Sequence, residues 1–196
     1  MIRCRDRLSR VQPRWWTGGL AILGGLVTAA PGAALDAEAF NQLLQTGSCP
    51  RCDLSGADLR RLDLSSVNLE QANLSGVNFH QAILDDADLS GADLRGAYLS
   101  DLSAINVNLN SAQLDQAMLI SADFTDASFY LTNFGNAFIE DTQFVNALLI
   151  GADLSDIVLV DGNFAGAIMC GADMHYGDYR YGCVSESVDA EESAVD

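Results

Sequence analysis

The chain has 196 residues, of which 49% are hydrophobic, so it is long enough to bury one substantial core and we predict a single folded domain. It carries 10 basic and 27 acidic residues, which gives a formal charge of −17. This acidity excludes a surface that binds nucleic acid or anionic lipid, because like charges repel. Any electrostatic partner is therefore expected to be basic.

The N-terminal segment, residues 1–34, differs from the rest of the chain. Five arginines among its first fourteen residues precede a short apolar run, and small residues end the segment at Ala34. This order is typical of a secretory signal peptide, and the apolar run is shorter than the roughly 20 residues that span a bilayer. We predict cleavage after Ala34, with a retained membrane anchor as the alternative. Cleavage removes five arginines and Asp6, which leaves 5 basic and 26 acidic residues and a formal charge of −21.

A short capping helix is predicted next, within residues 35–48. Asp36 is a favourable N-cap residue, and Gly47 is a favourable residue at which to end a helix. One face of this helix would carry three large apolar side chains: Phe40, Leu43 and Leu44. We expect that face to lie across the open end of the structure that follows.

From Cys52 to Tyr179, a bulky apolar residue recurs at nearly every fifth position. A small apolar residue usually stands two positions earlier, with Asp or Asn between the two. This period fits neither a helix nor a long strand, but it fits a three-residue strand followed by a two-residue turn. The small and the bulky residue would face the core, and the polar residue would face outward. One unit exchanges the two core residues, with Leu102 and Ala104, which conserves the core volume. Members of the bulky series include Leu54, Phe124, Phe144, Leu159 and Phe164.

Units such as Ala57-Asp58-Leu59 and Ala152-Asp153-Leu154 resemble the pentapeptide-repeat family. The resemblance covers about 26 consecutive units. It implies an all-β fold, a right-handed four-sided parallel β-helix with four units per coil and about 6.5 coils, here with the short N-terminal capping helix. We assign residues 49–183 to the β-helix and predict that residues 184–196 form a disordered acidic tail.

A coil of twenty residues predicts four outer faces. One face is polar, with Asp53, Asn73, Asp93, Gln113, Asn133, Asp153 and Asp173. Another face carries an apolar group that we predict to be an interface: Tyr98, Met118, Ile120, Phe138, Val158 and Val160. A further apolar group contains Tyr130, Leu148, Ile150 and Ile168. Contiguous exposed apolar patches tend to mark interfaces, but cover by the C-terminal segment or drift in the repeat would also explain them.

Four cysteines follow the signal segment: Cys49, Cys52, Cys170 and Cys183. An even number in an exported chain suggests disulfides, and four cysteines allow three pairings. The β-helix that the resemblance implies separates Cys52 from Cys170 by about five coils, or roughly 24 Å. It therefore implies one bridge between Cys49 and Cys52 and another between Cys170 and Cys183, one at each end of the column.

Few residues suggest catalysis. Cys49 and Cys52 have the spacing of a redox dithiol, but we favour a structural bridge at the cap, because Cys52 occupies an inward repeat position and nothing around it suggests a thioredoxin-like unit. The two histidines, His80 and His175, fall at turn positions far apart along the repeat. We predict no catalytic residue and no cofactor.

A cluster of carboxylates is the one candidate for metal binding. Asp85, Asp86 and Asp88 could hold calcium, but such a cluster is expected in a chain this acidic without any ligand. We therefore predict no metal site.

These observations predict an exported, non-enzymatic scaffold or protein-interaction module. Its expected partner is another protein or a second copy, with no nucleic acid and, after signal cleavage, no membrane. Resemblance to signal-bearing cyanobacterial members of the family implies the thylakoid lumen or the periplasm. Resemblance to pentapeptide-repeat proteins that mimic DNA and bind gyrase implies one alternative, which the acidity favours and the signal peptide opposes. The other alternative is a CxxC-dependent redox protein.

Overall fold

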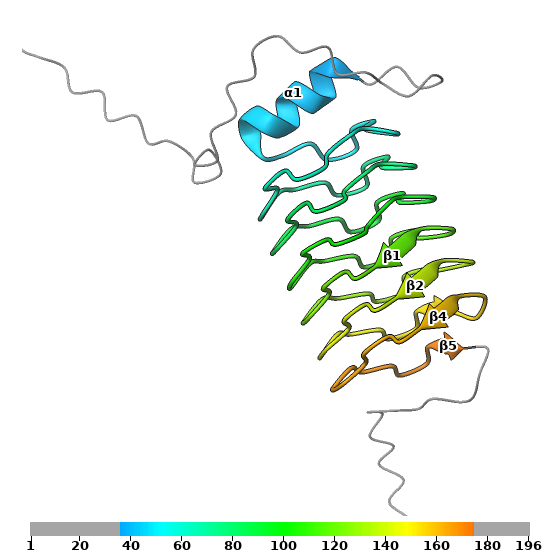
Figure 1. Cartoon of the computed structure of the whole chain (residues 1–196). Coiled ribbons are helices and arrows are strands. Elements are labelled where there is room, and N and C mark those ends of the chain that lie inside the picture. The colour runs from blue at the N-terminus through cyan, green and yellow to red at the C-terminus, as the bar shows by residue number, and fades with distance from the viewer. Residues whose placement is uncertain (1–35, 175–196) are drawn as a thin grey trace, which may run out of the picture.

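The computed structural model describes residues 36–174, which form a column of stacked coils with one helix, α1, across its first coil (Figure 1). The predicted signal segment, residues 1–34, lies outside the described residues. The predicted acidic tail, residues 184–196, also lies outside them. The five-residue period covers most of these described residues, and α1 precedes it.

Helix α1 spans Ala37–Thr46 and begins and ends where the sequence predicts. The Asp36 carboxylate accepts hydrogen bonds from the backbone N–H groups of Glu38 and Ala39, at 2.9 and 3.1 Å. These N–H groups have no acceptor within the helix, so the N-cap satisfies them. Gly47 ends the helix in the left-handed region, at φ 68°, which glycine adopts without steric cost.

The buried face of α1 covers the first coil. Ala39 and Leu43 are buried, and Phe40 packs against the same core while Leu44 is half-buried. The helix therefore shields apolar side chains that would otherwise face water at the end of the column. This placement agrees with the predicted capping role.

The coils pair through parallel backbone bridges between residues twenty positions apart. Four series of bridges run along the column, and their first members are Ser48, Asp53, Asp58 and Asp63. Each coil thus has four sides, as the twenty-residue spacing predicts. The predicted end of the repeats, near Tyr179, lies outside the described residues, so the number of coils stays a prediction.

Most sides of the coil are single bridges, because three residues between two turns leave little room for a regular strand. Within residues 36–174 the regular strands are β1 (Met118–Ile120), β2 (Phe138–Glu140), β3 (Asp153–Leu154), β4 (Val158–Val160) and β5 (Asp173–Met174). Strands β1, β2 and β4 form a parallel sheet in that order, and β3 pairs with β5. Strands β1, β2 and β4 are therefore one side of three successive coils (Figure 1), and β3 and β5 belong to another side.

The core is built from the bulky and small residues of each unit, as predicted. Phe124 and Phe144 stack with ring centroids 5.7 Å apart, and Phe144 and Phe164 stack at 4.9 Å. Leu102 and Ala104 are both buried, so the exchanged unit keeps its place in the core. Stacking of identical residues between coils is what makes the core continuous.

Leu159 departs from the predicted core. The repeat predicts that it faces inward, but its side chain is 39% exposed, whereas Ile139 is fully buried. Leu159 pairs in register with Ile139 of the preceding coil. Its exposure makes the prediction wrong for Leu159 in the part of the chain that the structure describes.

Candidate protein-interaction surface

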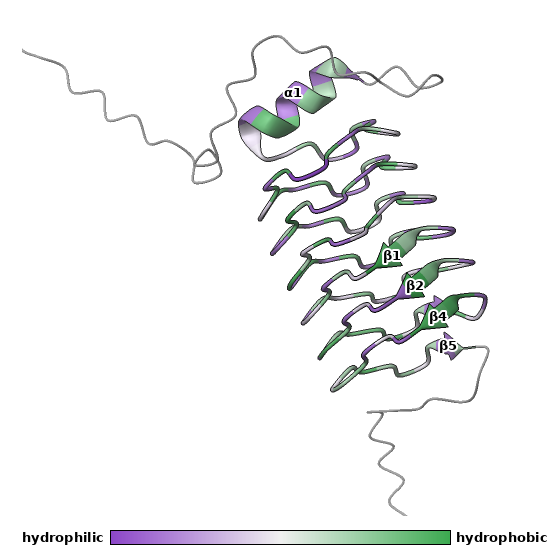
Figure 2. Cartoon of the chain, in the orientation of Figure 1, coloured by the Kyte–Doolittle hydropathy of each residue, from purple (hydrophilic) through white to green (hydrophobic). Residues whose placement is uncertain are grey.

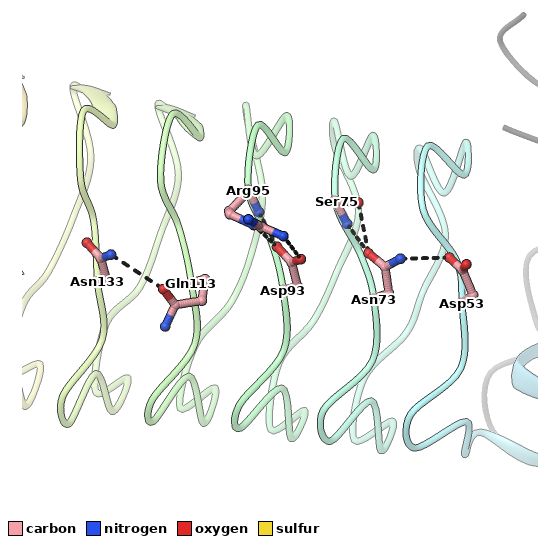
Figure 3. A network of polar contacts seen from close by, with 7 residues as sticks. All are labelled: Asp53, Asn73, Ser75, Asp93, Arg95, Gln113 and Asn133. Atoms are coloured by element: carbon pink, nitrogen blue, oxygen red, sulfur yellow. Dashed lines mark hydrogen bonds and ion pairs between the residues drawn. The ribbon is translucent and has the colours of Figure 1, made fainter. Parts of the chain in front are cut away.

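The polar face carries one outward side chain per coil (Figure 3). Asn73 donates a hydrogen bond from Nδ2 to Asp53 Oδ1 at 3.0 Å. Asn133 donates from Nδ2 to Gln113 Oε1 at 3.4 Å. These bonds join residues twenty positions apart, so they link neighbouring coils and confirm that the series shares one face.

The outward Asp and Asn side chains also hold the turns that follow them. Asn73 Oδ1 accepts hydrogen bonds from the backbone N–H and the hydroxyl of Ser75, at 3.2 and 2.8 Å. Asp153 Oδ1 accepts the same two bonds from Ser155, at 3.0 and 2.6 Å. Short polar side chains stabilise turns in this way. The preference for Asp or Asn at this position therefore has a structural explanation and needs no ligand.

Two arginines form ion pairs with a carboxylate of their own unit. Arg60 donates two hydrogen bonds to Asp58, at 2.7 and 2.6 Å, and Arg95 donates two to Asp93, at 2.8 and 2.6 Å. The arginine hydrogen bonds lower the pKa of Asp58 and the pKa of Asp93 below the ordinary value of a carboxyl group. These pairs are exposed to solvent, which screens them, so they adjust local charge more than they stabilise the fold.

The predicted interface forms one continuous row, which we call the apolar stripe. Tyr98 bridges Met118, Met118 pairs in register with Phe138, and Phe138 pairs with Val158. Since parallel neighbours lie roughly 4.8 Å apart, the row runs about 14 Å along the column. Figure 2 shows hydrophobic residues on β1, β2 and β4, the strands that carry this row. The stripe also includes Ile120 and Val160, the last residues of β1 and β4, which were predicted at turn positions.

The ends of the apolar stripe are its most exposed parts. Tyr98 is 49% exposed and Val158 is 53% exposed, whereas Met118 and Phe138 are half-buried. Met118 and Phe138 each have an apolar neighbour from the coil on either side, which covers part of their surface, whereas the preceding neighbour of Tyr98 is Asn78. The stripe is therefore a shallow apolar strip with projecting ends.

Ile120 and Val160 belong to a second row beside the first, and Glu140 lies between them in that row. The sequence interpretation missed this glutamate. It pairs in register with Ile120 on one side and with Val160 on the other. The signal was present, because residues 120, 140 and 160 share the twenty-residue spacing. A carboxylate thus lies directly beside the apolar row.

A second apolar group, which we call the corner patch, contains Tyr130, Leu131, Leu148, Ile150 and Ile168. Leu131 is its most exposed member, at 52%, and was not predicted. It adopts φ 55°, a left-handed conformation that a leucine rarely takes. Its side chain lies over Gly151, where an added Cβ would come within 2.8 Å of Leu131 Cδ2. An apolar residue at a turn position was the signal for this patch.

The structure contains the predicted disulfide between Cys49 and Cys52, with Cα atoms 5.5 Å apart. Cys49 is fully buried, and its Sγ lies 3.3 Å from the carbonyl oxygen of Ala39 in α1. A redox dithiol needs an accessible sulfur for attack; α1 covers the sulfur of Cys49, whereas Cys52 is half-buried. The burial of Cys49 favours a structural bridge. Cys170 is not free in the structure, and Cys183 lies outside the described residues, so their pairing stays a prediction.

His80 is the only histidine that the structure describes, since His175 lies outside residues 36–174. Its Nδ1 lies 3.2 Å from the carbonyl oxygen of Ser100 and 3.6 Å from the Asp101 carboxylate. These contacts explain the orientation of the ring at a half-exposed turn. They bring no nucleophile into reach of a base.

The acidic cluster of Asp85, Asp86 and Asp88 accepts hydrogen bonds from residues of the next coil. Asp85 accepts hydrogen bonds from the hydroxyl of Ser103 at 2.7 Å and from the backbone N–H of Ile105 at 3.0 Å. Asp86 and Asp88 each accept one from an asparagine twenty positions later, at 2.7 and 3.0 Å. Among the described residues no group of carboxylates, histidines and cysteines could hold a metal ion. The three carboxylates join coils and do not converge on one point.

The stacked coils and the repeat together define the class of protein. A family model of pentapeptide repeats matches this chain in eight copies, over residues 48–76, 63–101, 97–137 and 139–175. The chain belongs to the pentapeptide-repeat family. Membership implies the right-handed, four-sided β-helix that the sequence resemblance predicted.

Several solved structures are similar to this chain. A pentapeptide repeat protein from the cyanobacterium Cyanothece 51142 is 23% identical over 69% of this chain and 94% of its own, with a TM-score of 0.32. One from the Arabidopsis thaliana thylakoid lumen is 23% identical over 67% of this chain and 68% of its own, with a TM-score of 0.30. Full-length QnrB1, a plasmid-mediated fluoroquinolone resistance protein, is 22% identical over 68% of this chain and 77% of its own, with a TM-score of 0.35. Identities this low concern the fold alone. A comparison with curated proteins finds no match.

Within residues 36–174 no helix is long and apolar enough to cross a membrane. The one helix there, α1, has ten residues and serves as the cap.

Proposed function

We propose that this protein is an exported, non-enzymatic scaffold or interaction module that binds a protein partner on the apolar stripe. Pentapeptide repeat proteins are generally structural or interaction modules, which supports this class. The observation that carries the proposal is the exposure of Tyr98 and Val158, about half of each side chain, at the two ends of one in-register row. Exposed contiguous apolar surface tends to mark interfaces.

The fold does not require apolar residues at the positions of the stripe. On the same face, Asp58 pairs with Asn78, and Asn78 pairs with Tyr98, in the same kind of parallel bridge. The backbone thus accepts a polar residue here in the first coils and an apolar one in the later coils. A specific change of side chains on an unchanged backbone favours selection for binding over a packing requirement.

Export is part of the proposal and is supported by the predicted signal peptide. The thylakoid lumen origin of one similar structure is compatible with a lumenal location, and the periplasm is the other candidate compartment. Immunodetection of the chain in fractionated cells tests this part separately.

The test of the interface is a crosslinking pull-down from the exported compartment. Wild type is compared with Met118→Asp plus Phe138→Asp, which we expect to lose its partner because two carboxylates would be buried on docking. The matched control is Ile83→Asp plus Ile105→Asp, since these isoleucines are 38% and 37% exposed outside the stripe. Identical partners for wild type and the stripe variant would contradict the proposal.

A DNA-mimicking, gyrase-binding protein is the second candidate. The acidic column favours it, and the predicted signal peptide opposes it because gyrase is a cytoplasmic enzyme. Cell fractionation separates the two candidates, and a gyrase assay is informative only if the chain is found in the cytosol. The redox alternative is opposed by the burial of Cys49 beneath α1.

A further inference from the structure

We infer that the apolar stripe binds a cationic amphipathic segment of a partner protein, with apolar side chains on the stripe and Arg or Lys side chains along its edges. This inference rests on the proposed function, because it specifies the partner of the same surface. It follows from how charge is distributed around the stripe.

Charge is divided unevenly along the column. The four arginines between residues 36 and 174 are Arg51, Arg60, Arg61 and Arg95, all in the first coils. Residues 97–174 contain ten carboxylates and no basic residue. The apolar stripe lies in this second part, so its surroundings attract cations.

Carboxylates border the stripe on both edges. Asp101, Asp141 and Asp161 lie at the turns that follow its side of the coil, and all three are exposed. The turns that precede this side carry Asp115 and Asp156, and the turn before Tyr98 carries Arg95, whose charge is already paired with Asp93. An apolar strip between two acidic edges is complementary to a basic amphipathic segment.

Four of the bordering carboxylates have no partner of their own. No described residue donates a hydrogen bond to, or forms an ion pair with, the carboxylates of Glu140, Asp141, Asp156 and Asp161. Other outward acids are engaged, as Asp93 is by Arg95 and Asp126 is by Asn146. The unpaired acids beside the stripe are therefore available to a partner's Arg or Lys.

The same charges disfavour a second copy of this chain as the occupant. Joining two stripes would bring the edge residues Asp141 and Asp161 of one molecule toward carboxylates of the other, and residues 97–174 hold no basic residue to compensate. Like charges across an interface cost binding free energy. The nearest arginine in sequence, Arg95, already binds Asp93.

The length of the stripe sets the size of the segment. About 14 Å from Tyr98 to Val158 corresponds to about nine residues of helix or about four residues of extended chain. A short amphipathic segment, with apolar residues on one side and basic residues on the other, can cover this length.

The experiment measures binding of synthetic peptides to the full chain by fluorescence anisotropy. The probe is a labelled Leu/Lys amphipathic helix, compared with the same helix carrying Glu in place of Lys and with a Ser/Lys peptide that lacks apolar residues. We expect only the Leu/Lys peptide to bind well, at least about tenfold more tightly than either control peptide, because it alone matches both features.

Two double variants separate charge from apolar contact. Asp141→Asn plus Asp161→Asn should weaken the Leu/Lys peptide about threefold to tenfold and reduce its salt dependence. Glu38→Gln plus Asp173→Asn removes the same charge away from the stripe and should change affinity less than about twofold. Circular dichroism of each variant establishes that the column is folded.

The outcomes distinguish this inference from the proposed function. Equal binding of the Leu/Lys and Leu/Glu peptides, or equal loss in both double variants, would overturn the basic partner. If the stripe variant still loses its cellular partner, the interface itself stands. If the pull-down is unchanged and the Leu/Lys peptide does not bind, both are wrong.

Discussion

Phe144 and Phe164, twenty residues apart in sequence, lie face to face with ring centroids 4.9 Å apart and planes inclined by 5°. Phe144 also stacks on Phe124 and is fully buried between the two. One ring thus contacts both of its neighbouring coils, and its loss would open a cavity across three coils.

Phe144→Ala should lower the free energy of unfolding by about 3–5 kcal/mol, because it removes buried apolar surface and leaves a cavity. Urea denaturation followed by circular dichroism measures the change. Tyr98→Ala is the control, since half of that side chain is already exposed and we expect a change below about 1 kcal/mol. Equal effects of the two substitutions would contradict the role of the phenylalanine stack.

Removing the N-cap should expose the Cys49–Cys52 disulfide. Asp36→Ala should destabilise α1 by about 1 kcal/mol, because two backbone N–H groups lose their acceptor. Since α1 covers Cys49, reduction of the bridge by dithiothreitol should become faster, as measured by quenched thiol labelling and mass spectrometry. Asp36→Asn retains a capping oxygen and should reduce at nearly the wild-type rate. A rate unaffected by Asp36→Ala would show that the bridge is accessible without opening of α1.

The Arg60 and Arg95 ion pairs predict a specific pH dependence. Because the folded-state pKa of Asp58 and Asp93 lies below the unfolded value of about 3.9, their stabilising effect is present above that pH and is lost as pH falls through the lower, folded-state pKa. Arg60→Gln plus Arg95→Gln should therefore lower the free energy of unfolding at neutral pH. In strong acid the free energies of unfolding of the variant and the wild type should become equal. Carboxyl titration by NMR should show both pKa values returning toward the ordinary value.

The matched control for the ion pairs is Arg51→Gln plus Arg61→Gln. These arginines donate to the side-chain oxygens of Gln71 and Gln81, at 3.0 and 2.9 Å, and not to carboxylates. They should leave the pKa of Asp58 and Asp93 in place. A shift as large in the control would assign the effect to overall charge and not to the two pairs.

Leu131 and Asn136 allow a reciprocal test of turn strain, because both are exposed and adopt similar left-handed conformations, at φ 55° and 54°. Leu131→Asn should stabilise the column by about 0.5–1 kcal/mol, since asparagine tolerates this conformation better than leucine. Asn136→Leu should destabilise it by a similar amount. Thermal unfolding measures both changes. Destabilisation by Leu131→Asn would show that contact with Gly151 outweighs the strain.

Much of the interior was predictable from the sequence. The five-residue period specifies which side chains face inward, because successive residues in an extended segment point in opposite directions. The twenty-residue spacing then placed Met118 beside Phe138 and Asp53 beside Asn73, as the bridges confirm. The ends of α1 were also predictable, because they depend on nearby residues. Asp36 begins the helix through its hydrogen bonds, and Gly47 ends it through its left-handed backbone conformation.

The tertiary structure decided what each outward residue contacts, because those contacts come from other coils. It showed that Asp85 is held by Ser103 of the next coil, that α1 buries Cys49, and that Leu159 is 39% exposed. It also placed Glu140 in register between Ile120 and Val160. The repeat along the sequence determines whether a side chain points inward or outward. Its exposure and its hydrogen-bond partners depend on the neighbouring coils. The apolar stripe and its unpaired carboxylates could therefore be defined only from the stacked column.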